Sequence, residues 1–179
     1  MALKSTIYKA ELNVADMDRH FYSDFQLTLA CHPSETTERM MLRLLAFARH
    51  ASEQLEFGRG ISTEDEPDLW QKDLTGDIEL WVELGTPDPD RLRKACGRAR
   101  RVVLYCYGER SVPIWWDKHR SRLERFDNLE ILQVDQAGSD ALAALAQPSM
   151  RLQCTLEGID AWFSSGDQAV QITIVHLKR

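Results

Sequence analysis

The sequence predicts an α/β protein in which a mixed β-sheet is flanked by helices. Segments that alternate polar and apolar residues, as half-buried strands do, occur near the amino terminus and again in the centre of the chain. A central hairpin is followed by a short helical pattern and then by a continuous apolar run over 102–107, which is the strand–helix–strand order of a parallel crossover. With 179 residues, the chain is expected to form one domain over 1–179 that buries its own core.

The amino-terminal part of the chain predicts two strands and a long helix. Residues 4–14 and 22–31 each alternate polar and apolar side chains, and we expect them to pair as antiparallel strands at the start of the sheet. Ser34 or Thr36 can cap a helix, and apolar residues then recur at helical spacing as far as Leu55. The pattern therefore predicts a helix that ends at about Leu55.

A β-hairpin is predicted in the segment 68–83, around the turn signal at 75–76. A two-residue loop and a four-residue loop both pair residues whose numbers sum to 151. The predicted pairs are Asp68 with Glu83, Trp70 with Trp81 and Lys72 with Glu79. Side chains alternate along a strand, so these six share one face. A three-residue loop would shift the register by one residue and separate the two acids.

Asp68 and Glu83 are the candidate functional residues of this hairpin. Carboxylates directly opposite each other on paired strands have Cβ atoms about 4.5–5.5 Å apart, and such like charges destabilise a sheet unless a positive charge lies between them. A divalent cation with oxygen ligands is the simplest such charge. In the alternative interpretation, Asp68 lies just outside the strand and points into solvent, and Glu83 is a surface residue.

The rest of the chain predicts alternating helices and strands. The expected elements are a short strand over 55–60, helices over 89–100, 113–125 and 140–146, and strands over 102–107, 129–134, 150–156, 161–163 and 170–177. Trp115 and Trp116, at the start of the second of these helices, could stack on a base or be part of the core.

Charge is distributed unevenly along the chain. The net charge is −6, but residues 91–125 carry eleven Lys and Arg against three Asp and Glu. Arg91, Lys94 and Arg98 are spaced to lie on one helix face and are our candidates for contacts with nucleic acid. The alternative is a solvated helix face that balances acids elsewhere in the chain.

Cysteine usage and hydropathy predict a cytoplasmic protein without membrane segments. The four cysteines show no C-x-x-C spacing, which fits a reducing compartment. There is no apolar leader region and no apolar run of membrane-spanning length. The five histidines have no metal-ligand spacing, and no phosphate-binding loop or dinucleotide fingerprint is present.

Several runs of the sequence resemble the YaeQ family of bacterial proteins. These runs are Ser34-Glu-Thr-Thr-Glu-Arg-Met-Met41, Leu55-Glu-Phe-Gly-Arg-Gly60, Glu66-Pro-Asp-Leu-Trp70, Trp81-Val-Glu-Leu-Gly85 and Lys94-Ala-Cys-Gly-Arg-Ala99. That family is similar in fold to the PD-(D/E)XK nucleases, so the resemblance implies a restriction-endonuclease-like core with added amino- and carboxyl-terminal strands. It also implies that Asp68 and Glu83 are the acids of the two half-motifs. Gly85 stands where the motif lysine is expected.

The first function hypothesis is a metal-dependent phosphodiesterase, a nuclease with a degenerate motif. Asp68 and Glu83 would hold Mg²⁺ or Mn²⁺ with the carbonyl of Leu84, and the metal would acidify a bound water. Some members of the superfamily carry the lysine on the following helix, so the resemblance makes Lys94 the candidate replacement. Others use an acid of the preceding helix, which makes Glu38 a further candidate ligand.

The second hypothesis is a nuclease-fold module that performs no hydrolysis and binds nucleic acid or a protein partner. Gly85 favours this hypothesis, because it supplies no positive charge. Glu38 likewise has a structural alternative, since a carboxylate in the first turn of a helix is stabilised by the helix dipole.

Overall fold

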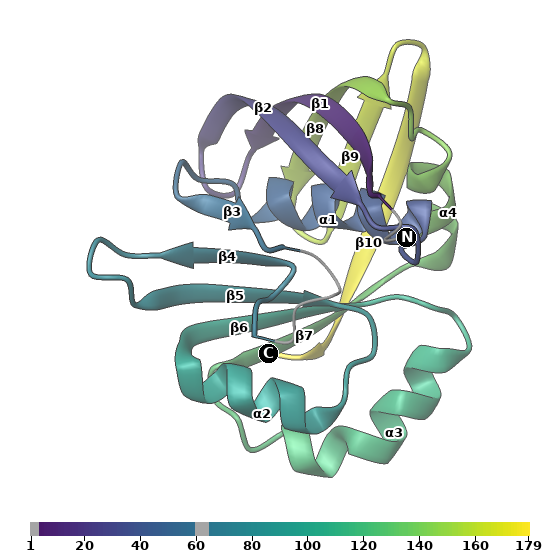
Figure 1. The fold of residues 1–179 in the computed structure, drawn as a ribbon. Coiled ribbons are helices and arrows are strands. Elements are labelled where there is room, and N and C mark those ends of the chain that lie inside the picture. Colours follow the sequence, from purple (N-terminus) through teal and green to yellow (C-terminus); the bar gives the residue numbers. More distant parts are fainter. Residues whose placement is uncertain (1–3, 60–64) are drawn as a thin grey trace. The chain divides into compact units, whose positions relative to one another are not determined.

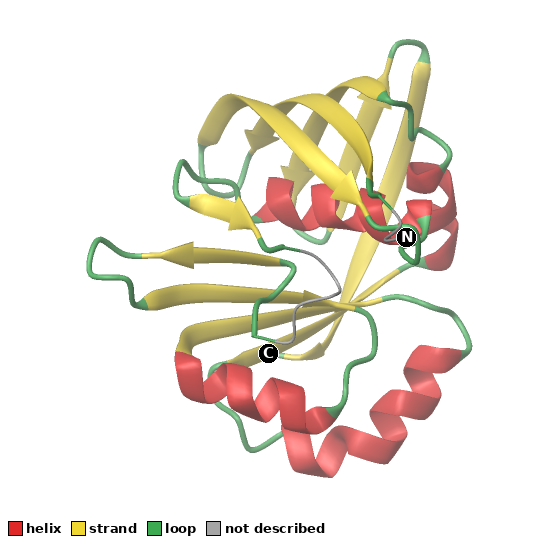
Figure 2. Cartoon of the chain, viewed as in Figure 1, coloured by secondary structure: helices red, strands yellow, loops and turns green. Residues whose placement is uncertain are grey.

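The computed structural model describes residues 4–59 and 65–179 (Figure 1). Its chain divides into two compact units. Unit 1 consists of Met1–Ala51 and Ala137–Thr173, and unit 2 consists of Ser52–Gln136 and Ile174–Arg179. Each unit contains a β-sheet and helices (Figure 2), so the predicted α/β class with a mixed sheet is confirmed.

Unit 1 contains a sheet with the strand order β2-β1-β8-β9-β10. Its elements are β1 (Thr6–Asp16), β2 (Phe21–Cys31), α1 (Thr37–Arg49), most of α4 (Gln136–Ala143), β8 (Ser149–Glu157), β9 (Asp160–Ser165) and the first part of β10 (Gln168–Lys178). β1 and β2 are antiparallel, as predicted from their alternation. β1 also pairs in parallel with β8, so that Lys9 lies opposite Ser149.

The core of unit 1 lies between this sheet and α1. Alternate residues of β1, among them Leu12 and Val14, are almost completely buried, and so are the apolar residues in the middle of α1. Thr36 caps α1 by accepting a hydrogen bond from the Arg39 N–H at 3.1 Å, which confirms one of the two predicted caps. α1 ends at Arg49, so the prediction that it reaches Leu55 is wrong.

Unit 2 contains a sheet with the strand order β10-β7-β6-β5-β4-β3. Its elements are β3 (Leu55–Phe57), β4 (Leu69–Lys72), β5 (Ile78–Leu84), α2 (Pro89–Arg98), β6 (Ala99–Cys106), α3 (Ser111–Leu123), β7 (Leu129–Val134) and the end of β10. β5, β6 and β7 are parallel neighbours, which confirms the crossover predicted between the strands that hold Trp81 and Val103.

Helices α2 and α3 lie on the same side of the unit 2 sheet (Figure 1). They cover a buried cluster that includes Trp81, Leu92, Leu104 and Trp115. The indole N–H of Trp115 donates to the Pro87 carbonyl at 2.9 Å and so fixes the turn before α2. Trp115 is therefore part of the core, as one of the two interpretations held. Among the described residues, no helix has both the length and the apolar character needed to cross a membrane.

Candidate functional site

The β4–β5 hairpin carries the two predicted acids. Backbone pairing places Trp70 opposite Trp81, and the two rings meet edge to face with centroids 6.1 Å apart, as the predicted register requires. The ladder then shifts, so that Lys72 pairs with Ile78. The predicted pairing of Lys72 with Glu79 is therefore wrong, whereas the register is as predicted toward the end that carries the acids.

The register shift follows from the turn at 73–77, which is longer than either predicted loop. The carboxylate Oδ1 of Asp73 accepts hydrogen bonds from the Thr75 N–H at 2.8 Å, the Thr75 hydroxyl at 2.6 Å and the Asp77 N–H at 3.0 Å. Gly76 adopts a φ of 91°, which glycine tolerates without a steric cost. These local bonds hold the extra residue in the turn.

Asp68 lies directly before β4, and its side chain is buried with 6% exposure. Its N–H donates to the Val82 carbonyl at 3.0 Å, and its carboxylate Oδ2 accepts the Leu84 N–H at 2.9 Å. The β4–β5 pairing ends at Leu69 and Val82, and the Asp68 carboxylate accepts the backbone N–H of Leu84 beyond this end. Because Glu83 is also buried, the alternative with Asp68 in solvent and Glu83 on the surface is wrong.

Glu83 is the centre of a buried polar cluster. Its carboxylate Oε1 accepts hydrogen bonds from the Trp81 indole N–H at 2.8 Å, from Nε of Arg91 at 2.9 Å and from Nη2 of Arg91 at 2.8 Å. Burial raises the pKa of the Glu83 carboxyl above its usual value. The Arg91 guanidinium opposes that rise, and the charge of Asp68 adds to it, so the two acids act on each other.

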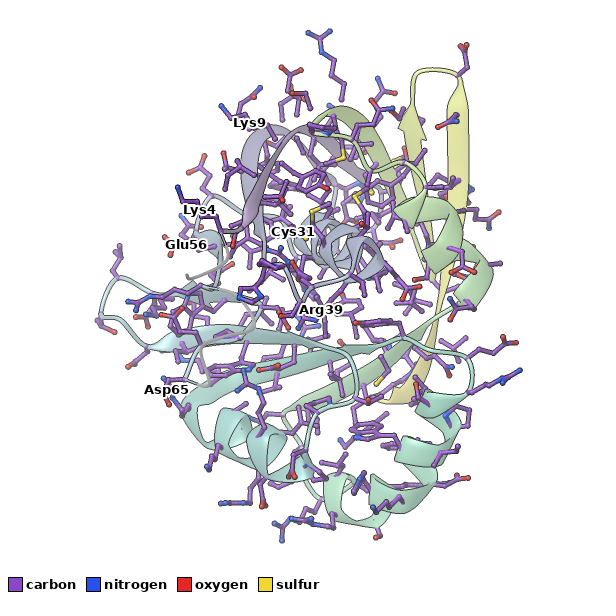
Figure 3. All side chains as sticks on the ribbon, turned by 45° about the vertical axis from the view of Figure 1, so that its right-hand side comes forward. Lys4, Lys9, Cys31, Arg39, Glu56 and Asp65 are labelled. Carbon is purple, nitrogen blue, oxygen red and sulfur yellow. The ribbon has the colours of Figure 1, made fainter. Side chains whose placement is uncertain are left out.

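Two arginines of α2 hold the segment that leads into Asp68. Arg91 donates from Nη2 to the carbonyl of Glu66 at 2.8 Å, and Arg98 donates from Nη1 to the carbonyl of Asp65 at 2.8 Å. Asp65 lies beside α2 (Figure 3). The guanidinium carbon of Arg98 is also 4.9 Å from the ring centroid of Trp81. These predicted nucleic-acid contacts are thus engaged within the protein.

Lys94, the predicted replacement for the motif lysine, is exposed on α2. Within the part of the chain that the structure describes, its ammonium group makes no ion pair or hydrogen bond, and the ion pair with Glu83 belongs to Arg91 instead. Lys94 does face a pocket of about 570 Å³ next to the buried cluster. The pocket is lined by Asp65, Trp81, Asp88, Asp90, Arg91, Lys94, Ala95 and Arg98.

Glu38, the third candidate ligand, belongs to unit 1 rather than to the unit that holds Asp68 and Glu83. It lies in the first turn of α1 and accepts a hydrogen bond from the buried Ser139 hydroxyl at 2.9 Å. This contact gives Glu38 a structural role within unit 1, and its role as a metal ligand stays a prediction.

The residues around Glu83 do not, as arranged, fit a divalent cation. A cation at Glu83 would meet the positive charge of Arg91, and the carboxylate Oε1 already accepts three N–H donors. Over residues 4–59 and 65–179, no three His, Cys, Asp or Glu side chains are grouped so that they could hold a metal ion. Binding of Mg²⁺ or Mn²⁺ therefore stays a prediction that requires Arg91 to move.

The role of Arg91 is what the sequence interpretation missed. The sequence places Arg91 three residues before Lys94, and both lie on the helix that follows β5. Only Arg91 lies in the first turn of α2, directly after the short connection from Glu83, and its long side chain reaches back to the end of the strand. The position of Arg91 in the first turn of the predicted helix was the one sequence feature that could have indicated its contact with Glu83.

Comparison with known proteins agrees with the resemblance seen in the sequence. The family model described as YaeQ protein matches residues 1–174. "Uncharacterized protein YaeQ" of Salmonella typhi is 47% identical over 174 residues, which cover 97% of this chain and 96% of that protein. The protein of the same description from Escherichia coli strain K12 is 44% identical over equal shares of the two chains.

Two crystal structures have closely similar folds. The YaeQ protein from Xanthomonas axonopodis pv. citri is 45% identical, with a TM-score of 0.94 over 97% of this chain and 98% of that one. The YaeQ protein from Pseudomonas syringae is 36% identical, with a TM-score of 0.91 over 98% of this chain and 97% of that one.

Proposed function

The chain belongs to the YaeQ family, and we propose that it is a non-hydrolytic protein with a restriction-endonuclease-like core that binds nucleic acid. In this proposal, Asp68 and Glu83 are the remaining acids of a PD-(D/E)XK motif. The nucleic acid contacts the exposed cations on and beside helices α2 and α3, in the cytoplasm.

The observation that carries the proposal is the ion pair between Arg91 and Glu83. Metal-assisted hydrolysis of a phosphodiester needs carboxylates that are free to hold the cation. Here the Glu83 carboxylate, only 5% exposed, is bound by the guanidinium at 2.8 Å. Gly85, at the position expected for the motif lysine, has a φ of 103°, a backbone conformation that disfavours a lysine side chain.

The surface of α2 and α3 supplies the charge that nucleic acid would contact. Several exposed cationic side chains there form no ion pair with any described residue, unlike most of the other cations between residues 91 and 125. These side chains are Lys94, Arg110, Lys118 and Arg125. Cations without a carboxylate partner are free to replace the counterions of a phosphate backbone.

The test is a binding titration by fluorescence anisotropy, with labelled single-stranded DNA, duplex DNA and RNA at several salt concentrations. We expect the parent protein to bind at low salt, with an affinity that falls as salt rises. A triple variant, Lys94→Ala, Lys118→Ala and Arg125→Ala, should lower the affinity at least tenfold. It should also reduce the slope of log K against log salt by about 3.

The matched control removes the same number of exposed cations from unit 1. A variant with Lys4→Ala, Lys9→Ala and Arg151→Ala has the same net charge as the first triple variant and should bind within about twofold of the parent. Equal losses in the two variants would show attraction by overall charge and not by the α2–α3 surface. No binding by the parent to any of the three nucleic acids would overturn the proposal.

A metal-dependent phosphodiesterase is the second candidate function. It is favoured by the buried carboxyl of Glu83, whose pKa is raised by burial and by the charge of Asp68, next to a pocket of about 570 Å³. Groups with perturbed pKa values beside a pocket are typical of catalytic sites. Asp68 and Glu83 would hold the metal, and Lys94 would support catalysis. Cleavage of DNA or RNA with Mg²⁺ or Mn²⁺ that is lost in Asp68→Asn would establish this candidate and exclude the first.

A further inference from the structure

The guanidinium of Arg91 lies among oxygen atoms of the kind that bind a hard cation. Its Nε and Nη2 contact the carboxylate of Glu83 at 2.9 and 2.8 Å, and Nη2 also contacts the carbonyl of Glu66 at 2.8 Å. The carboxylate of Asp68 is close enough for its charge to raise the pKa of Glu83. Carboxylate and carbonyl oxygens are the ligands that Mg²⁺, Mn²⁺ and Ca²⁺ prefer.

Both partners of the ion pair are held in place by other contacts. The Trp81 indole N–H fixes the Glu83 oxygen that Arg91 binds. The start of α2 is fixed by the Asp88 carboxylate, which accepts the Asp90 N–H at 2.8 Å. The fold therefore places the guanidinium of Arg91 against Oε1 of Glu83, so the positive charge at this carboxylate comes from the protein itself.

Removal of this charge would take away the cation that contacts the buried carboxylate of Glu83, whose pKa the charge of Asp68 already raises. Buried carboxylates that lie close to each other cannot both stay ionised unless a positive charge is near. In the folded protein Arg91 provides that charge to Glu83, while Lys94 is exposed and makes no ion pair with the described residues. A variant without the guanidinium would need either a bound proton or a bound cation at this place.

We propose that Arg91 acts as a built-in cation that excludes divalent metal from the Asp68–Glu83 cluster, and that Arg91→Ala converts this cluster into a divalent-cation site. The ligands of the new site would be the carboxylates of Asp68 and Glu83 and the carbonyl of Glu66. The inference rests on the part of the proposed function that makes the cluster non-hydrolytic. It does not depend on whether the protein binds nucleic acid.

The experiment measures the melting temperature of each protein in a Mn²⁺ titration, together with Mn²⁺ binding by calorimetry. The parent should show no saturable shift. Arg91→Ala should gain one, which reaches roughly 5–10 °C when Mn²⁺ is about 100-fold above its Kd. Arg91→Lys, which keeps a positive charge at this position, should resemble the parent.

Double variants test whether the new site uses the two acids. Arg91→Ala combined with Glu83→Gln, or with Asp68→Asn, should lose the Mn²⁺ response, because each lacks one charged ligand. If Arg91→Ala is unfolded without metal, recovery of the parent circular dichroism spectrum on addition of Mn²⁺ supports the inference, and no recovery overturns it.

Three other outcomes would also overturn the inference. The first is a folded Arg91→Ala variant that responds to Mn²⁺ no more than the parent. The second is a response that survives in both double variants, which would place the metal elsewhere. The third is a parent that binds Mn²⁺ through Asp68 and Glu83, which would favour the phosphodiesterase candidate. Failure of the nucleic-acid titration alone would overturn the proposed binding function and leave this inference intact.

Discussion

Ion pairs in this protein differ more in burial than in length. Glu35 and Arg43 of unit 1 approach to 2.6 Å with side chains only 3% and 4% exposed. Glu124 and Arg120 of α3 approach to the same 2.6 Å, with side chains 51% and 61% exposed. Solvent and salt screen the exposed pair, whereas a buried charge depends on its partner. The two pairs therefore differ in burial at equal distance, and Glu35 also contacts Arg39 at 2.9 Å.

Glu35→Ala should lower the free energy of unfolding by about 3–5 kcal/mol, because it removes the buried carboxylate that the buried guanidinium of Arg43 contacts at 2.6 Å. Chemical denaturation of the variant and the parent measures this difference. The matched control is Glu124→Ala, which should cost less than about 1 kcal/mol. Equal costs for the two variants would show that burial is not what makes the first pair important.

The raised pKa of Glu83 predicts how stability depends on pH. The unfolded chain releases this proton near the ordinary value of 4.5, whereas burial makes the folded protein keep it to higher pH. The stability that this carboxyl contributes is complete below about 4.5 and is lost as pH rises through the folded pKa. Glu83→Gln should therefore gain stability relative to the parent as pH rises above 4.5, as measured by denaturation at each pH.

Asp73→Asn is the control of opposite sign for this prediction. The Thr75 hydroxyl is the main cause that lowers the pKa of Asp73, so this carboxyl adds stability above its ordinary value of 3.8 and loses it as pH falls. Asp73→Asn should lose stability relative to the parent as pH rises toward 3.8. If Glu83→Gln follows the same course as Asp73→Asn, Arg91 and not burial sets the pKa of Glu83.

The sequence could predict the acids of the site but not their partner. The positions of Asp68 and Glu83 follow from alternation and register within one hairpin, which are local properties of the chain. The contact of Arg91 with Glu83 depends on where α2 lies against the end of β5 and on the rotamer of a long side chain. The position of Arg91 in the first turn of the predicted helix was visible in the sequence, but these two properties were not. The prediction therefore selected Lys94 by resemblance and missed Arg91 as the partner of Glu83.

At the level of elements, the start of α1 was easier to predict than its end. Thr36 was one of two predicted caps for α1, and it is the cap in the structure. The predicted end at Leu55 was wrong because the helical spacing of apolar residues continues past Arg49. Ala51 and Leu55 are buried, but they lie in the following loop and in β3. An apolar residue that is buried can belong to a helix, a loop or a strand, so an apolar pattern alone does not define where a helix ends.

Thr36→Ala should cost about 1 kcal/mol of stability, because the Arg39 N–H loses the side-chain acceptor that satisfies it at the helix start. The neighbouring Thr37→Ala is the matched control, since Thr37 is exposed at the first helical position and provides no cap. Thr37→Ala should change stability by no more than about 0.5 kcal/mol. A loss in Thr37→Ala as large as in Thr36→Ala would contradict this assignment of the cap.

For the whole molecule, β10 is the element that both units share. Its first part pairs with β9 in unit 1, and its last part pairs with β7 in unit 2. The sequence predicted a strand over 170–177 but not its partners, because pairing between distant segments leaves no local pattern. The same limit applies to the parallel pairing of β1 with β8.

A chain that ends at Thr173 should be markedly less stable than the full chain. The truncation removes the strand that covers one edge of β7 and the ammonium of Lys178, which donates to the carbonyls of Phe126 and Leu129 at 2.7 and 2.9 Å. We expect a lower denaturation midpoint and greater aggregation, since β7 then presents an unpaired edge. Removal of Arg179 alone is the control and should leave the midpoint unchanged. An unchanged midpoint after truncation at Thr173 would contradict the importance of this pairing.

The parallel pairing of β1 with β8 has a consequence for protein synthesis. β1 leaves the ribosome long before Ser149, the partner of Lys9, which is translated only after nearly the whole of unit 2. At about 5–20 residues per second, that interval is on the order of ten seconds. During this time β1 can pair with β2, while its other edge stays open to any extended segment nearby. The nascent chain is therefore a candidate client for chaperones that act at the ribosome.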